Sequence, residues 1–273
     1  MSRRGKTVLL HVALAALGLA TVAPLLWMVS VSLMHPGEAN TFPPPLLPSQ
    51  PTLENYRALF TRLDIGTYAR NSALLAFTLT ALSLLVNAMA GYAFAKLRFR
   101  GRDRLFQVLL GALVIPVQVA MLPLFLMIRS AGLVNSYWGV ILPGLASVFG
   151  IFLVRQYAQS IPEELLDAAR ADGAGEFRVF WSVALPLCRP VLVTLALFTF
   201  LGSWNDFMWP LIVLSDARKQ TLPVALAGLI GERAHDTELM MAGSVLTILP
   251  VLIVFLALQR AYVAGITLGG VKE

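Results

Sequence analysis

The chain has 273 residues, of which 58% are hydrophobic and 13% are charged, and its mean hydropathy is +0.75. Soluble domains carry about 25% charged residues, so this composition excludes an ordinary soluble domain and indicates a membrane protein. The formal net charge of +6 does not indicate nucleic-acid binding, because basic residues also gather beside membrane spans and no basic soluble region interleaved with aromatic residues is present. The single cysteine, Cys188, excludes an internal disulfide.

Six apolar segments are long enough to cross the bilayer, since a helix spanning about 30 Å of hydrocarbon needs roughly 20 residues. They predict an all-α integral membrane protein with six transmembrane helices, at residues 8–34, 71–95, 105–128, 138–154, 191–214 and 241–261. The basic start of the first segment resembles that of a signal peptide. Its apolar run is longer than that of a signal peptide and has no clear cleavage site, so we expect a retained helix.

The distribution of Lys and Arg predicts the orientation. With the N-terminus in the cytoplasm, the inner segments hold twice as many of these residues as the outer ones, which favours six spans with both termini cytoplasmic. The expected organisation has three parts. They are an N-terminal helix with an external proline-rich loop (1–67), a core of five transmembrane helices (68–264) that includes a polar loop at 158–190, and a cytoplasmic tail (265–273).

Three other connecting segments have distinct patterns. The external loop at 35–67 contains a short predicted helix that Thr52 can cap, and it is either a packed cover over the spans or a docking surface for an external partner. The inner loop at 96–104 holds five basic residues and is interpreted as a topology anchor near anionic lipid. The outer loop at 215–239 is compatible with a short interfacial or a re-entrant helix.

Residues 160–190 form a polar stretch between two apolar segments. Ser160 and Glu163 predict a capping box that starts a helix, which runs to about Ala171 and is ended by Gly173 in a left-handed conformation. A second helix is predicted by the spacing of Phe177, Phe180, Trp181 and Ala184. The stretch therefore predicts a two-helix knob projecting into the cytoplasm, or an amphipathic loop lying on the membrane surface.

This stretch resembles the signature of permease subunits of binding-protein-dependent ABC importers, which is Glu-Ala-Ala, three residues, Gly, nine residues, Ile, one residue and Leu-Pro. At that spacing the chain has Asp167-Ala168-Ala169, Gly173, Val183 and Leu185-Pro186. Asp in place of Glu and Val in place of Ile preserve charge or shape. The segments PTLENYRALF, SWNDFMWPLIVLSD and GITLGGVK further resemble the carbohydrate-importer branch of that family.

The resemblance implies a sugar importer subunit that forms half of the translocation pathway in a bacterial or archaeal cytoplasmic membrane. Its implied partners are a second homologous permease subunit, an ATP-binding-cassette ATPase dimer, an extracytoplasmic sugar-binding protein and the lipid bilayer. The chain itself would be no enzyme and would bind no cofactor or metal, because the partner ATPase uses ATP and Mg. The Gly-rich tail would insert at the ATPase interface.

The 160–190 loop would dock on the ATPase. Its candidate coupling residues are Glu163, Glu164, Asp167, Ala168, Ala169, Asp172, Gly173, Phe177, Leu185 and Pro186.

Polar and aromatic residues within the spans are candidates for a sugar path, because hydroxyl-rich ligands need hydrogen-bonding groups and aromatic faces. They are Asn87, Gln118, Trp204, Asn205 and Asp206. The alternative is that they make polar contacts between helices. An ion-driven carrier would need acids at the membrane centre, for which Asp206 is the lone strong candidate. A membrane enzyme would need a catalytic constellation, and the sequence shows none.

Overall fold

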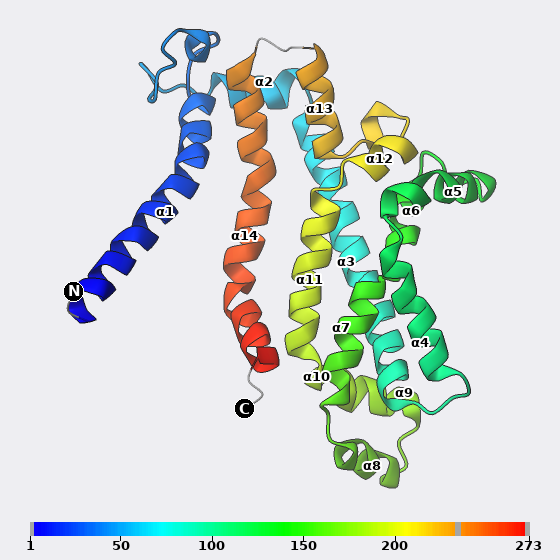
Figure 1. Ribbon diagram of the computed structural model, residues 1–273. Coiled ribbons are helices and arrows are strands. Elements are labelled where there is room, and N and C mark those ends of the chain that lie inside the picture. The colour runs from blue at the N-terminus through cyan, green and yellow to red at the C-terminus, as the bar shows by residue number, and fades with distance from the viewer. Residues whose placement is uncertain (1–2, 233–235, 271–273) are drawn as a thin grey trace. The chain divides into compact units, whose positions relative to one another are not determined.

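The computed structural model describes residues 3–232 and 236–270, and every regular element within these ranges is a helix (Figure 1). The predicted all-α class is therefore confirmed. The chain divides into two compact units. The first comprises Met1–Thr67 and Ala225–Pro250, and the second comprises Tyr68–Val224 and Val251–Glu273.

Three unbroken helices have the length and hydropathy of a membrane span, at Leu9–Ser32, Ile65–Lys96 and Thr237–Gln259. Three further pairs of helices reach that length and hydropathy only when taken together across a bend. The described residues thus contain three helices that are long and apolar enough to cross a membrane, or up to six such segments if each bent pair is one span. A multi-pass membrane protein follows from either count.

The first unit begins with α1 (Arg3–Ser32), followed by the 3₁₀ turn η1 (Glu38–Asn40) and the short helix α2 (Glu54–Arg62). The helix expected near 52–60 is thus present, and the Thr52 hydroxyl accepts a hydrogen bond from the Glu54 N–H at 3.2 Å. The buried Asn55 side chain fastens α2 to the end of α1, because its amide donates to the carbonyls of Ser32 and Met34.

Helices α13 (Leu222–Glu232) and α14 (Thr237–Gly270) contribute the rest of the first unit through residues 225–250. Glu238 is buried and accepts a hydrogen bond from the Ala39 N–H at 2.8 Å, which holds the loop after α1 against the start of α14. The helix α14 continues to Gly270, through most of the segment that was expected to be a tail. The last three residues of that segment lie outside the described residues.

The second unit is built around α3 (Ile65–Lys96). Its other helices are α4 (Arg102–Gly111), α5 (Val117–Ser130), α6 (Tyr137–Ile141), α7 (Val148–Gln159), α8 (Glu163–Ala171), α9 (Glu176–Val179), α10 (Leu185–Leu187), α11 (Arg189–Trp204) and α12 (Met208–Val213). Short 3₁₀ turns lie at Ala112–Val114, Leu142–Gly144 and Ala217–Lys219, and a π-helical turn lies at Phe180–Ala184.

Three predicted spans are not continuous helices. The segment expected at 105–128 bends by 107° between Arg102–Val114 and Val117–Ser130. Pro116 lies at this break in an extended conformation, since proline has no N–H to continue the ladder of hydrogen bonds. The segment at 138–154 bends by 42°, and that at 191–214 is interrupted after Trp204.

Helices α3 and α7 pack closely because glycines replace side chains where they meet. A Cβ atom added at Gly91 would lie 2.6 Å from the Val154 Cβ, and one added at Gly150 would lie 2.9 Å from the Asn87 side chain. Small residues at such contacts let two membrane helices approach each other's backbones. The loop after α7 is therefore attached to a helix that lies close against α3.

Candidate coupling loop and cavity

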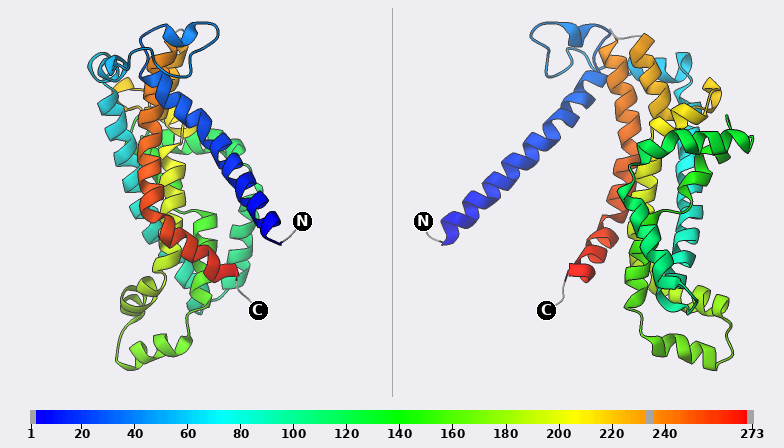
Figure 2. Two further views of the ribbon diagram at one scale, coloured as in Figure 1. Left: turned by 90° about the vertical axis from the view of Figure 1, so that its left-hand side faces the viewer. Right: turned by 45° about the vertical axis from the view of Figure 1, so that its right-hand side comes forward.

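The loop that follows α7 places α8 at the end of the second unit where α3 meets α4 (Figures 1 and 2). Leu166 is fully buried and Ile161 is nearly so, within a cluster that includes Tyr92 of α3. The opposite side of α8 exposes Glu164 and Ala168. The helix therefore has one face packed against the rest of the second unit and one exposed face.

The predicted capping box at the start of α8 is wrong. The Ser160 hydroxyl donates to the Tyr157 carbonyl at 2.7 Å, which satisfies the end of α7 rather than the start of α8. The residue before α8 is Pro162, and no side chain caps the helix there. Glu163 binds Lys96 of α3 instead of reaching back to Ser160.

The predicted end of α8 is confirmed. The helix stops at Ala171, and Gly173 follows in the left-handed region with φ of +83°. The Gly173 N–H donates to the Arg170 carbonyl at 2.9 Å, and the Ala174 N–H donates to the Ala169 carbonyl at 3.0 Å. No atom lies within 4 Å of a Cβ built on Gly173, so glycine is required here by backbone conformation and not by space.

The second half of the loop differs from the predicted single helix. The chain passes from α9 through the π-helical turn into α10. Val179 and Phe180 at the start of the π-helical turn and Ala184 at its end are buried. Phe177 and Trp181 are instead 69% and 50% exposed, and their rings stack with centroids 6.2 Å apart. The predicted apolar stripe is thus split between a buried side and an exposed aromatic pair.

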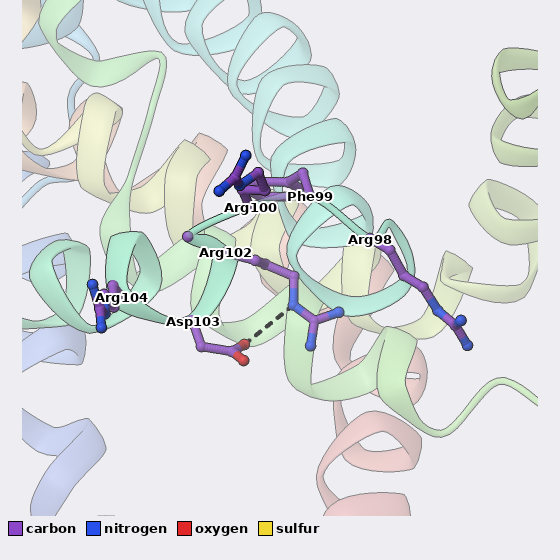
Figure 3. A pocket seen from close by; sticks show the side chains of 7 residues that line it. Arg98, Phe99, Arg100, Arg102, Asp103 and Arg104 are labelled. Carbon is purple, nitrogen blue, oxygen red and sulfur yellow. Dashed lines mark hydrogen bonds and ion pairs between the residues drawn. The ribbon is translucent and has the colours of Figure 1, made fainter.

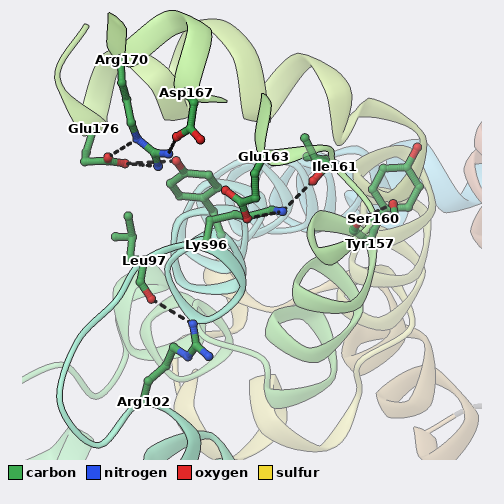
Figure 4. A network of polar contacts seen from close by, with 11 residues as sticks. Lys96, Leu97, Arg102, Tyr157, Ser160, Ile161, Glu163, Asp167, Arg170 and Glu176 are labelled. Atoms are coloured by element: carbon green, nitrogen blue, oxygen red, sulfur yellow. Dashed lines mark hydrogen bonds and ion pairs between the residues drawn. The ribbon is translucent and has the colours of Figure 1, made fainter. Parts of the chain in front are cut away.

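Lys96 connects the end of α3 to the start of α8 (Figure 4). Its ammonium group donates to the Ile161 carbonyl at 2.6 Å and to Glu163 Oε1 at 2.8 Å. The Lys96 side chain is only 4% exposed, whereas that of Glu163 is 56% exposed. The loop therefore covers a charged group of α3 and supplies the oxygens that this group requires.

Arg170 makes a second connection at the far end of α8. Its guanidinium group donates to Asp167 Oδ1 and to Glu176 Oε1, both at 2.7 Å. Glu176 also accepts a hydrogen bond from the Tyr92 hydroxyl of α3 at 3.2 Å. Lys96 and Tyr92 lie four residues apart on α3, so one face of this helix contacts the start of α8 directly and its end through Glu176 of α9.

The ionisation of Glu176 follows from these contacts. The hydrogen bonds from Arg170 lower the pKa of the Glu176 carboxyl below its ordinary value of 4.5, and the same contacts raise the pKa of Arg170. Both groups are therefore charged at neutral pH.

The structure brings the candidate coupling residues together at this end of the unit. Exposed side chains or backbone are found at Glu163, Glu164, Asp167, Ala168, Asp172, Gly173, Phe177 and Pro186. Ala169 and Leu185 pack partly against the buried cluster beneath the loop. The exposed set is the part of the loop that a partner can reach.

Asp206 lies at the break between α11 and α12 and lines two adjoining cavities of about 370 Å³ and 270 Å³. The first lies in the size range of ligand pockets, roughly 300–1,000 Å³. Both are also lined by Leu79, Gly144 and Ser203. One Asp206 oxygen accepts a hydrogen bond from the Trp209 N–H at 3.3 Å.

Thr221 adds a polar group to the larger cavity, and sequence reasoning missed it. Its side chain is buried, and in the described part of the chain its hydroxyl has no hydrogen-bond partner. A buried hydroxyl without a partner costs free energy unless a ligand or water satisfies it. A threonine in an apolar stretch carries no sequence signal of this kind.

The other candidates for a sugar path do not line these cavities. Asn87 is fully buried and donates to the Ser83 and Leu145 carbonyls, which supports the alternative of a contact between helices. Trp204 is buried and stacks on Phe200 with centroids 5.8 Å apart. Exposed side chains are found at Gln118 and Asn205, and the amide of Asn205 donates to the Leu201 carbonyl.

A sequence model of the family described as the inner membrane component of binding-protein-dependent transport systems matches residues 87–267. The chain belongs to this family. It is therefore a permease subunit of an ABC importer, a multi-pass membrane protein and a transporter component rather than an enzyme, as the resemblance implied.

The permease is similar to characterised transporters over nearly its whole length. It is 40% identical to the arabinooligosaccharides transport system permease protein AraQ of Halalkalibacterium halodurans, over 97% of this chain and 96% of the relative. It is 36% identical to the lactose transport system permease protein LacG of Rhizobium radiobacter, over 80% of each chain. A chain of a bacterial ABC transporter involved in alginate import has the same fold, with a TM-score of 0.85, 26% identity and coverage of 95% of this chain and 98% of that chain.

Proposed function

We propose that the permease imports a sugar or sugar derivative and forms half of the translocation pathway with a second homologous permease subunit. An ATP-binding-cassette ATPase dimer and an extracytoplasmic sugar-binding protein complete the transporter. The names of the similar proteins support this substrate class, since they include transporters for arabinooligosaccharides, lactose and diacetylchitobiose. A relative named for sn-glycerol-3-phosphate, at 31% identity, extends the class to a phosphorylated polyol.

The observation that carries the coupling role is the attachment of α8 to α3 at both ends, directly through Lys96 and indirectly through Glu176 of α9. A helix fixed at both ends moves with the helix to which it is attached, so a displacement of α8 is transmitted to the membrane part of the subunit. The exposed residues of α8, with Phe177, would seat in a groove of the ATPase. That ATPase would use ATP and Mg, and the permease itself would bind neither.

The proposed topology has six spans, with both termini in the cytoplasm of a bacterial or archaeal cell. The bias of basic residues supports it. The Lys96–Glu163 pair adds that the basic loop at 96–104 and the coupling loop at 158–190 lie on one side, as this topology requires. We retain 1–67 as an N-terminal region and 68–264 as the permease core, and 265–273 as a segment that reaches the ATPase interface.

The cavity that contains Asp206 is the proposed position of the sugar path. Its walls are mostly apolar, and Ser203, Asp206 and Thr221 supply polar groups beside the indole of Trp209. An apolar pocket with a few polar groups is the usual form of a small-molecule site. Trp204, Asn205 and Gln118 would then support the helices around the path, and Asn87 would hold α3 against the segment that precedes α7.

The test uses the permease purified with its partner subunits in lipid nanodiscs. Binding proteins loaded with an oligosaccharide, a disaccharide, a polyol phosphate or an amino acid are added, and the rate of ATP hydrolysis is measured. We expect stimulation by one of the first three ligands. Stimulation by the amino acid alone would contradict the proposed substrate class and leave the family assignment intact.

A further inference from the structure

The loop between α3 and α4 forms an open hollow of about 820 Å³ on the surface of the second unit. Seven consecutive residues line it, from Arg98 to Arg104 (Figure 3). Gly101 makes the turn in the left-handed region, with φ of +82°. The hollow is distinct from the Asp206 cavities, with which it shares no residue.

The positive charge of this loop is only partly neutralised by the protein. Lys96 is paired with Glu163, and Arg102 binds Asp103 at 3.1 Å and the Leu97 carbonyl at 3.2 Å. Within the ranges 3–232 and 236–270, no ion pair involves Arg98, Arg100 or Arg104, and the side chains of all three are exposed. In Figure 3, Arg98 and Arg104 lie on either side of Arg102.

An exposed apolar face begins directly beside these charges. Leu105 and Val108 lie three residues apart on α4, so they share one face of the helix, and they are 54% and 72% exposed. Phe99 of the loop is exposed as well. A ligand that fits both features must combine a negative group with hydrocarbon.

We propose that this site binds an anionic glycerophospholipid. Its phosphate would lie in the hollow that Arg98, Arg100 and Arg104 line, and its acyl chains would lie along Leu105 and Val108. Free phosphate would satisfy the arginines and leave the apolar face uncovered. A basic cluster at the start of a membrane helix is a known setting for anionic headgroups, since the charges lie at headgroup depth.

The proposed site predicts a large effect of charge removal. An arginine near an anionic membrane surface changes affinity by about fivefold, so removing three weakens binding by roughly a hundredfold. Because Coulomb attraction is screened by salt, the preference for anionic lipid should also fall as ionic strength rises.

The experiment uses the complete transporter in nanodiscs of phosphatidylcholine with a small fraction of photoactivatable phosphatidylglycerol that carries its reactive group in an acyl chain. After irradiation, mass spectrometry measures the fraction of labelled peptide that covers residues 99–113. We expect strong labelling of this peptide. Excess unlabelled phosphatidylglycerol should reduce the labelling, and inorganic phosphate should not. The triple variant Arg98→Gln, Arg100→Gln, Arg104→Gln should lose most of this labelling.

The matched control is the triple variant Arg57→Gln, Arg62→Gln, Arg129→Gln, which removes the same charge from three exposed arginines elsewhere. It should label the 99–113 peptide as the natural protein does. The proposal is overturned if both triple variants label equally, or if photoactivatable phosphatidylcholine labels the peptide as strongly. It is also overturned if the first variant keeps its labelling but no longer retains the ATPase, because the arginines would then serve a protein contact.

Discussion

Replacing Lys96 with methionine tests whether the attachment of α8 to α3 makes the coupling loop rigid. Methionine keeps the apolar stem of lysine and removes the ammonium group, which makes hydrogen bonds of 2.6 Å and 2.8 Å in the natural protein. The buried Ile161 carbonyl would lose its Lys96 partner, which costs about 1–3 kcal/mol. Glu163 is more than half exposed, so water can solvate its carboxylate. The loss of its ion pair with Lys96 therefore adds only about 0–1 kcal/mol.

A total of about 2 kcal/mol corresponds to roughly a 30-fold increase in local opening of α8. Hydrogen–deuterium exchange of the purified transporter would measure this directly in peptides that cover residues 163–171. Exchange of the buried centre of α3 should not change. We also expect more ATP hydrolysed for each sugar imported, because a loosely held loop transmits less of its movement.

Arg178→Gln is the matched control, since it removes one charge from an exposed residue of the same loop that has no ion pair in the described structure. It should leave the exchange of α8 unchanged. If Lys96→Met exchanges at the natural rate over residues 163–171, the attachment does not stabilise α8 and the proposed rigid coupling is wrong.

Three further perturbations follow from the same loop and from the cavity. The Gly173→Val variant should insert into the membrane but lose ATPase coupling, because a residue with a side chain costs about 1–2 kcal/mol in the left-handed conformation. The Gly173→Asn variant should retain much of the coupling, since asparagine adopts this conformation more readily. Normal transport by the valine variant would contradict this expectation. Asp206→Asn and Thr221→Val should each weaken sugar-stimulated ATP hydrolysis without changing membrane insertion, and unchanged stimulation in both would remove the cavity from the path. The Glu176 carboxylate has a pKa lowered by Arg170, so its contribution to stability is present above pH 4.5 and is lost as pH falls through the lower pKa of the folded protein. Thermal unfolding should therefore show a loss of stability below pH 4.5 that Glu176→Gln reduces, and an identical acid profile in that variant would contradict the role of the pair.

The end of α8 could be predicted from the sequence because its determinants are local. Gly173 alone can adopt the required backbone conformation without strain, and it lies two residues after the helix. The hydrogen bonds at the start of α8 could not be predicted, because the partner of Glu163 is Lys96, which is 67 residues away in the chain. Glu163 can take part either in a capping box with Ser160 or in an ion pair with a distant residue, and the sequence does not show which of the two forms.

In the apolar helices, too, some features could be predicted from the sequence and others could not. Apolar length correctly indicated a multi-pass helical protein, and the structure places Pro116 at the break in the third segment. The size of the bend there, 107°, is a tertiary property that the local sequence does not show. For the same reason, Asn87 could be recognised as a polar residue within a span, whereas its contacts with Ser83, Leu145 and Ser147 could not be predicted.

The burial of Lys96 has a consequence for the order of assembly. During synthesis this ammonium group emerges with α3 and has no partner until the chain has grown by 67 residues to Glu163. At about 5–20 residues per second, that interval lasts roughly 3–13 s. On the proposed topology, Lys96 is in that period a free positive charge that favours retention of the end of α3 in the cytoplasm, and afterwards the arriving loop covers it. On that topology, one side chain acts first on the orientation of α3 and then on the attachment of the loop at 158–190.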